Sequence, residues 1–118
     1  MYLQRVPFRG HIMSRSVALT LIEEEALAKL GQRLRIARLQ RNLTQADVAS
    51  RAGTTRKSIV ALEAGKSNIG VGLLVKVLGV LGYPSRIADL LDSDPLGEDM
   101  ATVHGRKQAR NNDGVADF

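Results

Sequence analysis

The chain has 118 residues and a formal net charge of +5, which is enough sequence for one compact domain with a modest core. Hydrophobic residues make up 44% of it but aromatic residues only 3%, and tryptophan is absent, so a core has to be built from aliphatic side chains. The absence of cysteine excludes disulfides, thiolate metal sites and thiol catalysis, and it is consistent with the reducing cytoplasm.

The positive charge is concentrated in the middle of the chain. Residues 30–91 contain ten Lys or Arg against three acidic residues, a net charge of +7, whereas residues 1–29 carry +1 and residues 92–118 carry −3. A compact block with this charge attracts polyanions, and neutralising phosphates is the usual source of sequence-independent affinity for nucleic acid. We therefore expect double-stranded DNA to be the partner of this block.

Residues 1–29 form an N-terminal extension, in which Met13 is an alternative start. The apolar run at 17–22 is too short for a signal peptide and is closed by Glu23, Glu24 and Glu25, so we predict a cytoplasmic protein with no membrane association. The three glutamates are typical of the acidic first turn of a long helix and are not interpreted as a catalytic cluster. The segment SVALTLI at 16–22 fits a strand added to a dimer as well as a buried helical extension.

Apolar positions at intervals of three and four residues predict five helices and therefore an all-α fold. The expected ranges are 24–41, 45–52, 56–64, 71–81 and 84–91. In the fourth helix the residues expected to face inward are Val71, Leu74, Val75, Leu78 and Leu81. After residue 91 the sequence becomes polar, and we predict a mobile C-terminal tail over 92–118 with one short helix at 98–110.

Capping residues mark the ends of the second and third helices. The Thr44 hydroxyl is placed to accept a hydrogen bond from the amide of Asp47, whose carboxylate favours the positive start of the helix. Gly53 supplies the left-handed residue that ends the second helix, and Thr55 caps the third, which Gly65 ends. Two short helices are thus joined by a tight turn.

The spacing of four residues across this turn indicates a helix-turn-helix. Ala49 is small where the two helices cross, Gly53 turns the chain, and Ile59 and Leu62 hold the second helix of the pair against the first. Where this motif binds DNA, the second helix enters the major groove with its N-terminal residues at the base edges. The sequence therefore predicts a recognition helix that begins at Arg56.

Cationic residues open this helix, where most helices prefer acidic ones. If Ile59 and Leu62 point inward, Lys57 and Ala61 lie on the opposite face, where a basic side chain can donate to guanine and a small one can touch a thymine methyl. The alternative is an ordinary solvated helix face. The candidate base-reading residues are Arg56, Lys57, Val60 and Ala61.

The stretch LTQADVASRAGTTRKSIVALEAGKS resembles the Cro/C1-type helix-turn-helix family of lambdoid phage repressors and related bacterial regulators. The resemblance extends over residues 30–91 and rests on Leu43-Thr44-Gln45, Ala49, Gly53, Ile59, Leu62-Glu63 and Gly65-Lys66. It implies a five-helix, lambda-repressor-like fold, a homodimer and an inverted-repeat operator. It also implies a structural pair between Arg38 and Glu63. The residues assigned to DNA phosphates are Gln45, Thr55, Ser58, Lys66, Ser67 and Asn68.

Family members often carry Gln or Ser where this chain has Arg56 and Lys57, so the base preference of the family is not carried over. The function expected from the resemblance is sequence-specific regulation of transcription, with a dimer that represses by covering promoter elements. Residues 1–29 and 92–118 lie outside the resemblance.

The alternative function comes from the tail. The segments DPLGEDM and GRKQAR resemble the ends of HipB-type antitoxins, which implies a HipA-like toxin kinase as partner and autoregulation of the operon. The basic residues of the tail, Arg106, Lys107 and Arg110, fit phosphate contacts, a docking surface or a solvated end.

An enzyme is not expected, and neither is a cofactor. His11 and His104 are isolated from carboxylates at ligand spacing, so no metal site is predicted. The sequence AGKS at 64–67 resembles the end of a phosphate-binding loop, but it follows a helix and lacks the upstream glycine.

Overall fold

The computed structural model describes the backbone of residues 17–112 and the side chains of residues 17–103. The chain divides into two compact units, between residues 87 and 88. The elements in chain order are α2 (Leu21–Gln40), α3 (Gln45–Ala52), α4 (Arg56–Glu63), α5 (Val71–Val80), the 3-10 helix η2 (Arg86–Asp89) and α6 (Pro95–Asn112). The described residues thus form five α-helices and no strand, and the all-α prediction is confirmed. None of these helices is both long enough and apolar enough to span a membrane.

A capping box sets the start of α2. The Thr20 hydroxyl accepts from the Glu23 amide, and the Glu23 carboxylate accepts from the Thr20 amide. The helix therefore begins at Leu21, three residues before the expected start, and runs across the boundary expected between residues 29 and 30. Glu23 lies in the acidic first turn, as predicted.

The segment before this helix matches neither of the two structures that the sequence allowed. Residues 17–20 have no regular secondary structure, and residues 21 and 22 belong to α2. The side chains of Leu21 and Ile22 are exposed, so this helical extension is not buried. Residue 16 and the earlier residues, including His11 and Met13, lie outside the described part of the chain.

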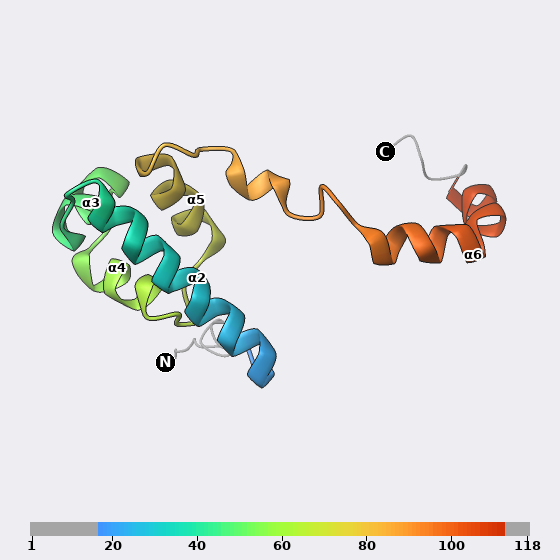
Figure 1. The fold of residues 1–118 in the computed structure, drawn as a ribbon, viewed down its shortest axis with the longest axis horizontal. Helices are drawn as coiled ribbons and strands as arrows, with labels where there is room; N and C mark the ends of the chain where they lie inside the picture. Colours follow the sequence, from blue (N-terminus) through green and yellow to red (C-terminus); the bar gives the residue numbers. More distant parts are fainter. Residues whose placement is uncertain (1–16, 113–118) are drawn as a thin grey trace, which may run out of the picture. The chain divides into compact units, whose positions relative to one another are not determined.

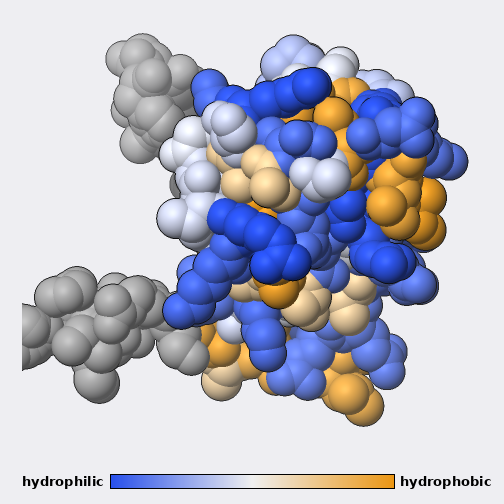
Figure 2. Space-filling model, turned by 90° about the vertical axis from the view of Figure 1, so that its left-hand side faces the viewer, coloured by the Kyte–Doolittle hydropathy of each residue, from blue (hydrophilic) through white to orange (hydrophobic). Residues whose placement is uncertain are grey.

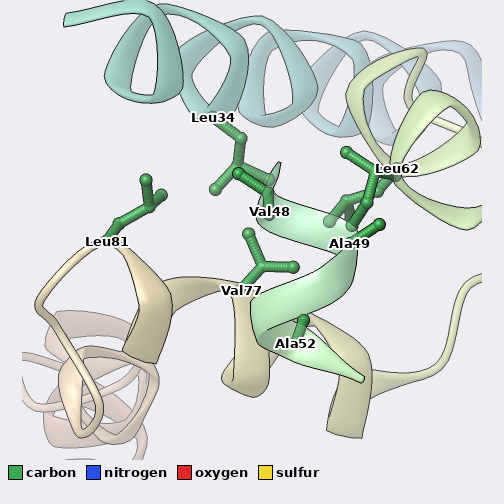
Figure 3. Packing of buried hydrophobic residues seen from close by; sticks show 8 residues of the cluster. Leu34, Val48, Ala49, Ala52, Leu62, Val77 and Leu81 are labelled. Carbon is green, nitrogen blue, oxygen red and sulfur yellow. The ribbon is translucent and has the colours of Figure 1, made fainter. Parts of the chain in front are cut away.

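An aliphatic core joins α2 to α5. Figure 3 shows Leu34 of α2 pointing toward α3, which contributes its buried residues from the middle of the cluster. The buried residues are Leu34, Val48, Ala49, Ala52, Ile59, Leu62, Val77 and Leu81. Full burial of an aliphatic side chain stabilises a fold by about 1.5–3 kcal/mol, so this cluster is the main source of stability.

A glycine lets α2 cross the end of α4 at close range. A Cβ added to Gly31 would lie 2.5 Å from the backbone oxygen of Glu63 and 2.8 Å from that of Leu62. Real Cβ atoms do not approach so closely, so a side chain at this position would push the two helices apart. Nothing in the neighbouring sequence marks Gly31, because its contact is with the backbone of residues 62 and 63, about thirty positions away.

Helix α5 has the predicted position but is rotated relative to the prediction. Val71 was expected to face inward, yet 69% of it is exposed, whereas Val77 is the fully buried residue of this helix. Leu74, Val75 and Leu78 are half-buried, and Leu81 belongs to the core. Packing against α3 decides which side of this uniformly apolar helix is buried, and the sequence period alone does not contain that information.

The α-helix predicted at residues 84–91 is wrong. The chain forms only the four-residue helix η2 there, and the ring of Tyr83 lies 4.0 Å from the guanidinium carbon of Arg86. Leu90 and Leu91 are exposed, and Leu91 has a φ of 66°, outside the helical region. A short helix needs an apolar face packed against a neighbour, and these two leucines lack such burial.

Helix α6 is longer than the short helix expected in the tail. Asp94 caps it by accepting from the amide of Gly97 at 2.9 Å, and Pro95 occupies the first turn, where its missing N–H costs nothing. The helix runs from Pro95 to Asn112, so this part of the predicted mobile tail is regular structure. The side chains of His104 and of the three basic residues at 106, 107 and 110 lie outside the described ones.

Candidate nucleic-acid interface

The turn between α3 and α4 is built from local hydrogen bonds. Thr44 and Asp47 form a reciprocal capping box at the start of α3, with distances of 2.8 and 2.9 Å. Gly53 ends this helix with a φ of 70°, and the amide of Thr54 donates to the carbonyl of Ala49. Gly53 is the residue type that adopts this left-handed conformation without steric cost. These contacts fix the angle at which α4 leaves α3.

The start of α4 is capped by hydroxyl groups. Thr55 accepts from the Ser58 amide at 3.2 Å, and the two hydroxyl oxygens are 3.1 Å apart. No acidic residue lies in the first turn of α4, where Arg56 and Lys57 have exposed side chains. The positive end of the helix dipole therefore coincides with two cations, an arrangement that favours an anion outside the helix.

Burial separates two faces of α4. Ile59 and Leu62 are buried in the core, while Val60 is exposed and Ala61 is half-buried. Lys57, Val60 and Ala61 thus lie on the side of the helix away from α3. Because α4 has eight residues, it is about 12 Å long, close to the width of the major groove of about 12 Å.

A buried ion pair anchors the end of α4 to α2. The Arg38 guanidinium donates to both carboxylate oxygens of Glu63, at 2.7 and 3.0 Å, and to the Leu43 carbonyl at 2.9 Å. The two side chains are 8% and 7% exposed. The hydrogen bond to Glu63 is the main reason why the pKa of Arg38 is raised, so the guanidinium stays protonated.

Gln45 joins this polar cluster. Its side-chain amide donates to the Glu63 carboxylate at 3.1 Å, which ties the start of α3 to the end of α4. The family resemblance predicts a phosphate contact for Gln45. In the structure its side chain bonds to Glu63 and thereby connects α3 to α4.

A shallow hollow of about 510 Å³ lies between the end of α2 and the starts of α3 and α4. Gln45 and Arg56 line the same hollow, together with Arg35 and Asn42. Arg35 and Asn42 were not predicted as parts of this site. In the sequence, Arg35 is one of many residues of the basic block, and Asn42 only interrupts the helical pattern. Asn42 has a φ of 57°.

The loop after α4 holds the remaining candidates. Gly65 and Lys66 close the helix by donating from their amides to Leu62 and Ala61, and Gly65 has a φ of 75°. Lys66, Ser67 and Asn68 follow as exposed residues. The candidates named from the sequence therefore divide into two groups, one at each end of α4.

The side of the molecule on which α3 and α4 lie in Figure 1 is covered mainly by hydrophilic side chains, with apolar ones in separate patches (Figure 2). Protein surfaces that meet nucleic acid are of this polar kind. The described residues contain no group of three acidic or histidine side chains that could hold a metal ion.

Comparisons with known proteins agree with this geometry. A helix-turn-helix family model matches residues 34–90. The uncharacterized HTH-type transcriptional regulator y4mF of Sinorhizobium fredii (strain NBRC 101917 / NGR234) is 42% identical to the chain over 55 residues, which cover 47% of this chain and 72% of the relative. The segment that the family model matches includes the capped turn, both of its helices and the residues of the hollow at their start. The chain belongs to the Cro/C1-type helix-turn-helix family, which points to a DNA-binding transcriptional regulator and not to an enzyme.

Proposed function

We propose that this protein is a dimeric repressor that reads an inverted-repeat operator through α4. One observation carries the proposal: exposed basic residues open α4, and further candidates for phosphate contacts lie at both of its ends. An eight-residue helix flanked in this way can enter a major groove while both ends are held on the DNA backbone.

Base reading is assigned to the exposed side of α4. Arg56 and Lys57 are the donors, and arginine pairs with guanine through two hydrogen bonds. Ala61 is small enough to let the helix approach the groove floor, where Val60, 39% exposed, offers an apolar contact to a thymine methyl. The bases preferred at each position follow from this set of residues and are not inherited from other family members.

Phosphate contacts are assigned to the two ends. At the first end, Gln45 opens α3, and the Thr55 hydroxyl caps α4 and lies 3.1 Å from the Ser58 hydroxyl. At the second end, Lys66, Ser67 and Asn68 occupy the exposed loop. Contacts of this type fix the register on the duplex but do not distinguish sequences.

A two-fold symmetric dimer would place two copies of α4 one helical turn apart on the same side of the DNA. Bound across a promoter, the dimer excludes RNA polymerase by steric overlap. Repression of this kind needs no ligand and no catalytic group, and it takes place where chromosomal DNA is, in the bacterial cytoplasm.

The antitoxin alternative requires a surface for a HipA-like kinase. The exposed apolar residues of α6 are the candidate for such a surface. We favour the repressor because the exposed basic residues at the start of α4 fit DNA binding directly.

Selection from random duplex DNA with the purified full-length chain, at two salt concentrations, tests the proposal. We expect an enriched inverted repeat whose half-sites are one helical turn apart, retained at the higher salt. Enrichment of no sequence, together with binding that vanishes at the higher salt, would mean that the basic block supplies only general phosphate affinity and would contradict the proposal.

A further inference from the structure

The face of α2 that borders the hollow carries a cation without an acidic partner. Arg35 and Arg38 both line the hollow, together with Leu39, and their spacing of three and four residues places them on one side of α2. The Arg38 guanidinium is already engaged by the Glu63 carboxylate and by a backbone carbonyl. Arg35 has an exposed side chain and forms no ion pair within the part of the chain that the structure describes.

The hollow gathers positive charge from two helices. Arg56, at the start of α4, lines it as well as Arg35, and no Asp or Glu is among the described residues that line it. The two cations therefore repel each other when the hollow holds only water. An anion in the hollow would offset this repulsion and would be attracted by both guanidinium groups.

The position of the hollow favours a phosphate of DNA as that anion. It is shallow and adjoins the start of α4, so it is open to the backbone of a duplex whose groove receives this helix. A guanidinium group is planar and can donate two parallel hydrogen bonds to a phosphate, a geometry that a lysine ammonium does not reproduce.

We propose that Arg35 holds a backbone phosphate of the DNA in this hollow, beside Arg56. Arg35 belongs to α2 and lies outside the helix-turn-helix. It is a positioning residue: the phosphate that it holds carries no sequence information but fixes where α4 lies in the groove. The inference deepens the proposed function and rests on its DNA binding, though not on an operator.

The salt dependence of binding to a random-sequence duplex tests the contact with the full-length chain. Arg35→Ala should weaken binding about two- to fivefold near 0.1 M salt and should lower the slope of log affinity against log salt by about one. Arg33→Ala is the matched control, because Arg33 is also exposed on α2 but does not line the hollow. It should change the slope much less, and equal slopes for the two variants would overturn the proposal.

A conservative substitution separates charge from a structural role. Arg35→Lys keeps the positive charge, so it should keep the salt slope of the unmodified chain while losing part of the affinity. Thermal unfolding should give the same Tm for Arg35→Ala and Arg33→Ala, since both remove an exposed side chain from α2. A slope for Arg35→Lys as low as that for Arg35→Ala would contradict a phosphate contact.

Neutral methylphosphonate groups, placed one at a time in the selected operator, locate the phosphate. One position in each half-site should weaken the unmodified chain and have no further effect on Arg35→Ala, whose ranking of single-base variants should be unchanged. Additive losses at every position would refute the contact. A chain that selects an operator but shows equal slopes with and without Arg35→Ala keeps the repressor and loses this inference. A chain that selects none but loses slope with Arg35→Ala does the opposite.

Discussion

The helix-turn-helix and the C-terminal region differ in how far their apolar side chains are buried within the chain. In residues 44–68 the local signals agree with the tertiary structure: Thr44 and Thr55 cap the helices, Gly53 turns the chain, and the apolar residues expected to hold the two helices together are buried. In residues 84–103 the side chains of Leu90, Leu91, Leu96, Met100 and Val103 are exposed. The apolar side chains that hold the first region together are buried within the chain, whereas those of the second lie at its surface.

The difference extends to how charge is used. In the helix-turn-helix, Arg38 and Glu63 are buried as a pair, and the pair holds the recognition helix in place. In α6 the acidic residues Glu98 and Asp99 are exposed.

Glu63→Ala should give the largest loss of stability. It leaves the buried Arg38 guanidinium without its carboxylate and Gln45 without its acceptor, which costs about 3–5 kcal/mol. Urea unfolding followed by circular dichroism measures the loss, and Glu25→Ala, at an exposed position of α2, should change it by about 0.5 kcal/mol or less. An unchanged unfolding free energy combined with lost DNA binding would assign Glu63 to the interface instead.

Gly31→Ala should destabilise the first unit by about 1–3 kcal/mol, because its Cβ would collide with the backbone of α4. Gly72→Ala is the matched control, since a Cβ at Gly72, in the first turn of α5, meets nothing within 4 Å. That substitution should stabilise the protein by up to about 1 kcal/mol through helix propensity. Thermal unfolding of both variants gives the comparison, and shifts of the same sign would refute the close approach of α2 and α4.

Removing one helix cap from each region should destabilise only the region that contains the cap. Thr55→Ala should cost about 1 kcal/mol in the unfolding of the helix-turn-helix, because the Ser58 amide loses its acceptor. Asp94→Ala removes the corresponding bond to the Gly97 amide, but its effect should be confined to the helicity of α6. Amide hydrogen exchange resolves the two, and loss of protection in α4 on Asp94→Ala would contradict the independence of the regions.

Acid should weaken the start of α3 slightly. The backbone amide of Thr44, and then its side chain, hold the pKa of Asp47 below its ordinary value. The capping contribution is therefore fully present above the unfolded pKa of about 3.9 and is lost as the pH falls through the lower folded pKa. Wild-type stability should fall more steeply than that of Asp47→Asn below about pH 4, and parallel curves would exclude a role for this carboxylate.

The sequence predicted the helix-turn-helix well because its signals are local. Capping at Thr44 and Thr55 and the turn at Gly53 involve residues a few positions apart, so they can be identified from spacing. The helix expected at 84–91 failed because its stability depends on burial that spacing does not reveal. The rotation of α5, which buries Val77 and exposes Val71, is likewise set by packing.

Parts of the site were missed for the same physical reason. The bond from Gln45 to Glu63 and the position of Arg35 beside Arg56 join segments that are distant in sequence. Gly31 could not be identified from the sequence, because the need for a glycine within α2 arises from the close approach of α4.

One binding experiment tests whether α4 reads bases while its two ends hold phosphates. The affinities of Arg56→Ala and Lys66→Ala are measured for the selected operator, for its single-base variants and at several salt concentrations. Arg56→Ala should cost about 1–3 kcal/mol and relax the preference at one base pair, whereas Lys66→Ala should weaken all sequences alike and reduce the salt dependence. If both variants changed affinity and preference in the same way, the division of this interface into base readers and phosphate holders would be wrong.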